Sequence, residues 1–125
     1  MHWLAVAIGG ALGAMSRYAV SIWMVDSAVG KFPYATLCVN VLGSFVMGLL
    51  YVLILERGVL PVEMRSLLMI GFLGAFTTFS TFSLDALGLW QNGEPVLALA
   101  YALGTVVLCL AAVSVAVWLT RLFLI

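Results

Sequence analysis

Charged residues are scarce in this chain of 125 amino acids, which holds five Lys or Arg residues and five Asp or Glu residues. They make up 8% of the sequence, whereas a soluble domain carries about a quarter. So few charges cannot cover a water-exposed surface, which excludes water as the main solvent. The net charge of zero and the lack of a basic patch exclude the electrostatic footprint of a nucleic-acid binder. We therefore expect a lipid bilayer, and no nucleic acid, around the chain.

Metal ligands and general acid–base groups are also rare. Cys38 and Cys109 are the two cysteines, and both sit inside apolar runs, which favours small buried side chains over a disulfide or a metal site. Asp85 is the one carboxylate embedded in an apolar run, and no histidine lies in one. We therefore do not expect the protein to be an enzyme.

Long apolar runs fill the sequence instead, and 66% of the residues are hydrophobic. A transmembrane helix needs about 20 apolar residues to cross a hydrocarbon layer of about 30 Å. The runs predict four such helices, at about residues 3–25, 34–55, 62–91 and 96–123. We expect an all-α membrane protein that forms a single transmembrane domain over residues 1–125.

Three of the predicted helices carry one small or polar face, because the residues concerned recur every four positions. Glycines on such faces let another backbone approach closely. Polar groups facing lipid are costly, so these faces favour an oligomer in which they meet, and a dimer is the smallest one. The residues on the three faces are Gly9, Gly13 and Arg17, then Thr36, Asn40 and Ser44, then Tyr101, Thr105 and Cys109.

The stretch 74–83 is the most unusual part of the third run, because it places hydroxyl and aromatic residues where lipid would favour Leu and Val. Glycine weakens a helix, and Thr or Ser hydroxyls compete for backbone carbonyls. We therefore predict that the third helix is broken near its middle, around residues 74 to 78. Carbonyls freed by such a break would suit a cation such as Na⁺.

The embedded polar groups are mostly hydrogen-bond donors. They include the amide of Asn40, the guanidinium of Arg17 and several hydroxyls, and donors without carboxylates suit an anion. Phenylalanine edges carry positive quadrupole charge and can also face an anion, and Phe76, Phe79 and Phe82 recur every three residues. The sequence therefore indicates a site for an anion, with a cation as the alternative at the break.

The loop charges give only a weak orientation signal. Four spans put both termini on one side of the membrane, together with Arg57, Arg65 and Arg121, while Lys31 lies on the other side and Arg17 within its helix. Positive charge in short loops normally fixes orientation. A bias of three against one or two is compatible with insertion in both orientations.

The sequence resembles the CrcB/Fluc family of fluoride channels over essentially its full length. The resemblance rests on the glycine-to-arginine stretch from Gly9 to Tyr18, on Asn40 within Val-Asn-Val-Leu-Gly-Ser, and on the stretch from Gly74 to Ser83. It implies an antiparallel, dual-topology homodimer, multi-pass in the cell (inner or plasma) membrane, with two fluoride pores and a central structural Na⁺. It further implies passive export of fluoride, which protects against its toxicity.

The resemblance also implies roles for individual residues. Phe79 and Phe82 correspond to the phenylalanines whose edges contact fluoride, with Ser80 and Thr81 as neighbouring hydroxyl donors. The remaining roles are pore residues on the second and fourth helices (Asn40, Tyr101 and Thr105), a vestibule arginine that concentrates anions (Arg17), and backbone carbonyls that hold Na⁺ (Gly74 and Thr77). Cys109 departs from the pattern, which often has serine, and a thiol is a weaker donor.

Two other functions fit a small four-helix membrane chain. A small multidrug transporter has a similar size and topology, but it relies on an embedded glutamate in the first helix, where this chain has Arg17. A non-transporting partner for a larger membrane complex would suit the glycine faces, but it would leave the polar stretch of the third helix without a purpose.

Overall fold

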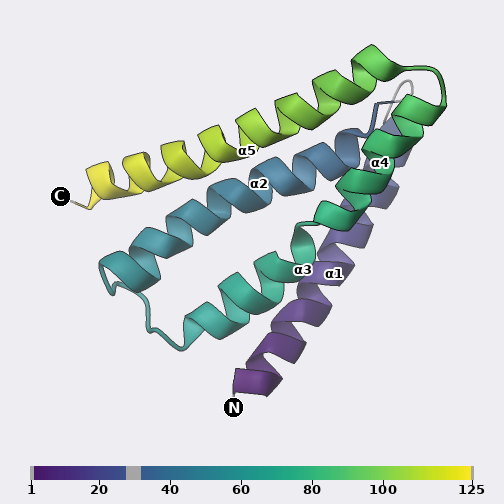
Figure 1. Cartoon of the computed structure of the whole chain (residues 1–125). Coiled ribbons are helices and arrows are strands. Elements are labelled where there is room, and N and C mark those ends of the chain that lie inside the picture. Colours follow the sequence, from purple (N-terminus) through teal and green to yellow (C-terminus); the bar gives the residue numbers. More distant parts are fainter. Residues whose placement is uncertain (1, 28–31, 125) are drawn as a thin grey trace.

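The computed structural model describes residues 2–27 and 32–124, and the side chains of 2–24 and 32–124 (Figure 1). Every element within these ranges is helical, and four segments are long and apolar enough to cross a membrane. This confirms the predicted all-α class and the prediction of four helices that could cross a membrane. The elements are α1 (His2–Ser27), α2 (Tyr34–Leu50), η1 (Tyr51–Glu56), η2 (Arg65–Leu73), α3 (Gly74–Phe76), α4 (Phe79–Gln91) and α5 (Pro95–Phe123).

π-Helical segments lie at the end of the second span and at the start of the third. α2 continues directly into the π-helix η1, and Gly58, with a positive φ of 63°, turns the chain after it. The third span begins with the π-helix η2 at Arg65, three residues later than the sequence predicts. The delay arises because residues 61–64 form a turn, in which the Met64 amide donates to the carbonyl of Pro61.

α1 packs against η2 and α3 through direct backbone contact. Gly9 and Gly13 are buried, and a Cβ added at either position would collide with a backbone carbonyl of η2, that of Leu67 or Phe72. The predicted glycine face of the first helix is therefore used inside the chain, because only glycine lets the two backbones come this close.

α2 packs against α5, and α4 packs against the first half of α5. Gly48 allows the first contact, since an added Cβ would lie 2.6 Å from the carbonyl oxygen of Val113. Two buried clusters result. One joins α2, η1 and the η2–α3 segment around Val39 and Leu73, and the other joins α4 to α5 around Phe82 and Tyr101.

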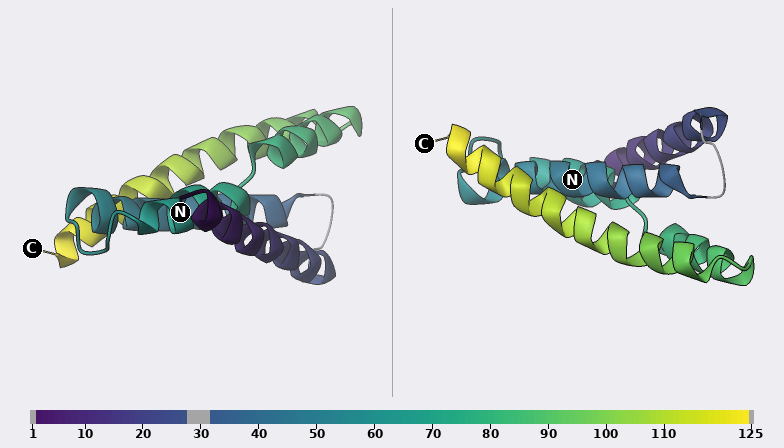
Figure 2. Two further views of the ribbon diagram at one scale, coloured as in Figure 1. Left: turned by 90° about the horizontal axis from the view of Figure 1, so that it is seen from below. Right: turned by 90° about the horizontal axis from the view of Figure 1, so that it is seen from above.

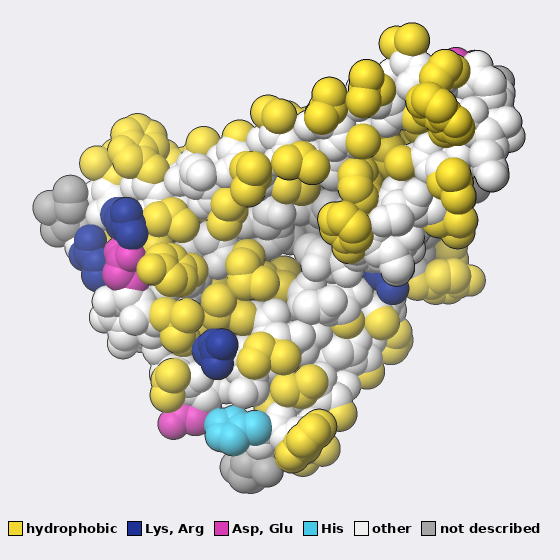
Figure 3. All heavy atoms as spheres, in the orientation of Figure 1, with side chains coloured by type: hydrophobic (Ala, Val, Ile, Leu, Met, Phe, Trp, Pro, Cys, Tyr) yellow, Lys and Arg dark blue, Asp and Glu magenta, His cyan; other side chains and the backbone are white. Residues whose placement is uncertain are grey.

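The chain is splayed. Figure 2 shows the end of α1 and the α4–α5 pair diverging on opposite sides of α2. The described ends of the chain lie toward the same end of the molecule (Figure 1), as four spans require. Hydrophobic side chains cover much of the face seen in Figure 3, and many large ones are exposed, as lipid surroundings allow. Lys31, part of the weak orientation signal, lies outside the described residues.

Candidate functional site

Two residues between α3 and α4 leave the helical conformation. Thr77 has φ −87° and ψ 160°, and Thr78 has φ −152° and ψ 124°, so both are extended. Together they form a non-helical step between α3 and α4. Gly74 remains in the short helix α3, although the predicted break begins at this residue. The local cause is a run of two β-branched threonines, which fit an extended backbone better than a helix.

The side chain of Asn40 on α2 bonds to the backbone of Thr78. Its Nδ2 donates to the Thr78 carbonyl at 3.0 Å, and its Oδ1 accepts from the Thr78 amide at 2.8 Å. One primary amide thus satisfies both backbone groups of an extended residue at membrane depth, where water cannot. A primary amide carries a second Nδ2 hydrogen, so Asn40 retains one donor beyond this pair.

Thr78 also starts α4. Its Oγ1 accepts a hydrogen bond from the amide of Thr81 at 3.2 Å, which is the geometry of a helix N-cap. The same Oγ1 lies 3.4 Å from the hydroxyl of Ser80. Asn40 therefore fixes the backbone of Thr78, and the side chain of Thr78 in turn caps the N-terminus of α4.

The backbone carbonyls of residues 74–77 lose their usual helical partners at this step. In a continuous helix the amide of Thr78 would bond to the carbonyl of Gly74, and the amide of Thr81 to that of Thr77. The two amides donate instead to Asn40 and to Thr78 Oγ1. The carbonyls of Gly74 and Thr77, which the family resemblance associates with Na⁺, are thus among those that the break releases from helical bonding.

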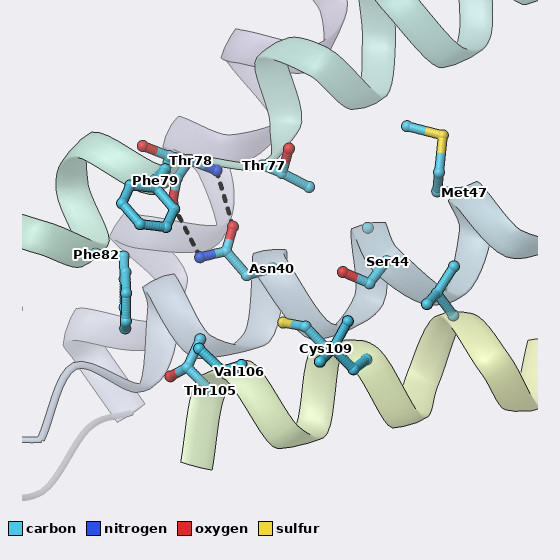
Figure 4. A pocket seen from close by; sticks show the side chains of 13 residues that line it. Asn40, Ser44, Met47, Thr77, Thr78, Phe79, Phe82, Thr105, Val106 and Cys109 are labelled. Carbon is cyan, nitrogen blue, oxygen red and sulfur yellow. Dashed lines mark hydrogen bonds between the residues drawn. The ribbon is translucent and has the colours of Figure 1, made fainter. Parts of the chain in front are cut away.

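A groove with a volume of about 420 Å³ opens beside the step, between α2, α4 and α5. Figure 4 shows Asn40 and Ser44 on α2, Phe79 and Phe82 on α4, and Thr105 and Cys109 on α5 around it. Among the residues that the structure describes, the groove is lined by hydroxyl, amide and thiol groups between apolar side chains, and by no Asp, Glu, Lys or Arg. The other lining residues are Gly43, Met47, Thr77, Thr78, Val106, Leu110 and Val113.

Phe79 and Phe82 meet edge to face at the groove, with ring centroids 5.4 Å apart and an interplanar angle of 68°. Their surroundings differ, since Phe79 is 76% exposed and Phe82 only 8%. Phe82 also contacts the ring of Tyr101 at 5.1 Å. Phe79 is therefore free of the packing that fixes Phe82.

Thr105 carries an unsatisfied hydroxyl. Its Oγ1 is buried and makes no hydrogen bond to the described residues, although the residue lines the groove. A buried hydroxyl without a partner costs free energy, on the order of 1–3 kcal/mol. A ligand in the groove that accepts a hydrogen bond would remove this cost.

Tyr101 lies behind the groove rather than in its lining. It is fully buried, and its hydroxyl donates to Oδ2 of Asp85 at 3.3 Å. Its ring stands at 87° to that of Phe32, with centroids 5.3 Å apart. Tyr101 therefore supports Phe82 from behind and joins α5 to α4 through Asp85.

The remaining predicted residues surround the step. Nε of Arg17 on α1 donates to the carbonyl of Ala75 at 3.1 Å, which ties the first helix to α3. Ser80 and Gly74 are exposed, and the half-buried Thr81 contributes its amide to the cap of Thr78. None of these four is in the groove lining.

The structure thus brings Asn40, Phe79, Phe82 and Thr105 together, with Thr77 at the edge of the same groove. Sequence reasoning gave Thr78 no role of its own, and so missed the part that it plays in holding the break. The signal that could have found it was local, because a threonine directly before a helix is a preferred N-cap.

Together these features define a class: a helical membrane protein with four apolar spans and a donor-lined groove beside a break in the third. Comparison with known proteins is more specific. A model of the family described as CrcB-like protein, Camphor Resistance (CrcB), matches residues 4–117. The chain therefore belongs to the CrcB family, which confirms the resemblance seen in the sequence.

Individual relatives agree with this assignment. The chain is 60% identical to a protein of Saccharophagus degradans over 120 residues, covering 95% of this chain and 89% of the relative. It is 53% identical to a protein of Hahella chejuensis over 123 residues, covering 98% and 97%. Each relative is named fluoride-specific ion channel FluC, which describes a channel and not an enzyme. The expectation that this chain is not an enzyme is thereby confirmed.

Proposed function

We propose that this chain is a fluoride-selective channel that exports fluoride passively across the cell (inner or plasma) membrane and protects against its toxicity. The observation that carries the proposal is the groove, which is lined by the rings of Phe79 and Phe82, by Asn40 with its amide, and by Thr105, whose buried hydroxyl has no partner among the described residues. These groups supply positive edges and donors to an anion. The names of the relatives favour this function over a multidrug transporter or a non-transporting partner.

The groups that line the groove can act in sequence on a desolvated anion. Stripping water from a small ion costs on the order of 20 kcal/mol in the Born limit, so several donors must replace it. Phe79 is exposed and can receive the ion, Asn40 retains one amide hydrogen, and Thr105 offers its hydroxyl. Arg17, tied to Ala75 by one of its five N–H groups, would attract anions toward the break.

The assembly is part of the same proposal. We expect an antiparallel, dual-topology homodimer with two pores, because one splayed chain leaves its groove open and its lipid-depth polar groups partly exposed. A structural Na⁺ would lie at the dimer centre, where each chain offers the carbonyls of Gly74 and Thr77. The donor set fits, because backbone carbonyls at unwound helices suit Na⁺. The ion would supply positive charge that draws the two breaks together.

Reconstitution tests the proposal. Liposomes that contain the purified protein and a fluoride load should release fluoride to an external electrode, and protein-free liposomes should not. Replacing Phe82 with Ile should abolish release while the protein still elutes as a dimer. Undiminished release from Phe82→Ile would refute the role of that ring, and no release from the unsubstituted protein would refute the channel.

A further inference from the structure

A second groove lies on α5 toward the C-terminal end and shares one lining residue, Val113, with the groove described above. It has a volume of about 340 Å³ and is lined by Val113, Ser114, Val117, Trp118 and Arg121. These residues lie at four-residue spacings on neighbouring rows of the helix, so the groove follows the helix axis. It is apolar along the two valines and ends at a guanidinium.

The guanidinium is fixed in place. Nε and one terminal nitrogen of Arg121 donate to the two carboxylate oxygens of Glu56, at 2.7 and 2.6 Å. This bidentate pair uses two of five N–H donors, and the side chain of Arg121 remains 49% exposed. Three donors are therefore still available on a preoriented cation.

A second cation adds to the local charge. Nε of Arg57 lies 3.8 Å from Glu56, and another of its nitrogens donates to the carbonyl of Leu124 at 3.2 Å. Two arginines share one carboxylate, so the cluster is net positive. Figure 3 shows basic side chains around an acidic one at the end of the molecule that carries the C-terminus.

The depth of this cluster matches a membrane interface. Arg121 lies in the last turn of α5, whose 29 residues span about 43 Å and so reach from the hydrocarbon into the headgroup region. Trp118, 62% exposed, flanks the groove, and tryptophan favours the same depth. This groove is apolar along its length and ends in a net positive cluster at headgroup depth. It therefore suits a ligand that has an apolar chain and a negatively charged head.

We propose that this groove holds an anionic phospholipid, with an acyl chain along Val113 and Val117 and its phosphate at Arg121 and Arg57. The lipid would join the end of α5 to η1, which the Glu56–Arg121 pair already connects. The proposal does not depend on fluoride transport, because its polar end, formed by Glu56, Arg57 and Arg121, lies outside the lining of the first groove.

Native mass spectrometry of the protein released from mixed phosphatidylglycerol and phosphatidylcholine vesicles tests this inference. One positive charge near an anionic lipid favours binding by about fivefold, so we expect retained phosphatidylglycerol to exceed phosphatidylcholine by about that factor. Arg121→Gln should remove the preference. Arg65→Gln, an exposed arginine at the same end of the chain but outside the cluster, is the matched control and should keep it.

A second variant separates lipid binding from loss of the ion pair. Val117→Phe fills the groove and leaves Glu56, Arg57 and Arg121 intact, so it should reduce retention of both lipids. Equal retention of the two lipids by the unsubstituted chain, or equal losses in Arg121→Gln and Arg65→Gln, would overturn the proposal. So would a disulfide between two copies of Val117→Cys that the unsubstituted chain does not form, because a second copy would then cover the groove.

Discussion

The two halves of the third span pack against their neighbours in opposite ways. Before the step, η2 and α3 pack backbone to backbone on α1, and glycines at the seam leave no space between them. After the step, α4 packs on α5 through side chains and exposes Phe79 and Ser80. The first half is a rigid support, and the second half exposes side chains that could contact an ion.

The difference separates two kinds of sensitivity. A substitution in the α1–η2 seam meets backbone, which cannot move aside, so it should affect folding first. A substitution around the groove meets open volume or a single hydrogen bond, so it should affect transport more than folding. The predictions below test this difference between support and transport.

The largest effect is expected in the seam. Gly13→Val places side-chain atoms against the carbonyl of Phe72, and overpacking of this kind costs about 1–3 kcal/mol or more. We expect little folded protein on size-exclusion chromatography and a strongly lowered thermal midpoint. Gly104→Ala is the control, since an added Cβ there meets no atom within 4 Å. If both variants fold equally well, the seam is not rigid.

Asn40 on α2 both supports the backbone of Thr78 and lines the groove, so Asn40→Asp should affect folding and transport together. The carboxylate keeps an acceptor for the Thr78 amide but loses the donor to the Thr78 carbonyl and the donor left for the groove. The lost hydrogen bond to a charged ligand is worth about 1.5–3 kcal/mol, so fluoride efflux should fall by at least about tenfold. Stability should also fall, by about 1–3 kcal/mol, because the Thr78 carbonyl loses its donor, and thermal unfolding would measure this loss. A normal efflux rate would argue that Asn40 only supports the backbone.

Thr105→Val should change transport alone. The isosteric replacement removes a buried hydroxyl that has no partner among the described residues, so the thermal midpoint should stay or rise slightly. Efflux should fall by up to about tenfold if the hydroxyl bonds to the ion. Thr120→Val is the matched control, because the hydroxyl of Thr120 already donates to the carbonyl of Ala116 at 2.6 Å and lies outside the groove lining. Equal efflux from both variants would remove Thr105 from the path.

The sequence predicted those features that depend on composition and helical period. The apolar runs predicted four spans, and four-residue spacing placed Asn40 and Thr105 on polar faces. Those faces meet at the groove because α2 packs against α5.

Tertiary contacts decided the rest. Spacing alone grouped Tyr101 with Thr105 and Cys109, but the ring of Tyr101 is buried against Phe82 and Phe32. Nor could spacing show that Asn40 would bond to Thr78, 38 positions away in the chain. The π-helical segments η1 and η2 also depend on packing and turn geometry rather than on a sequence period.

Phe79→Ile offers the most direct test of the central claim, that the groove beside the step is the path of fluoride. The ring is 76% exposed, so its loss should leave the thermal midpoint of the protein nearly unchanged. Fluoride release from liposomes, followed by electrode at matched protein density, should nevertheless be abolished or reduced by at least about tenfold, because a charged ligand loses an interaction worth roughly 1.5 kcal/mol. Release at the unsubstituted rate from a folded Phe79→Ile protein would contradict the account.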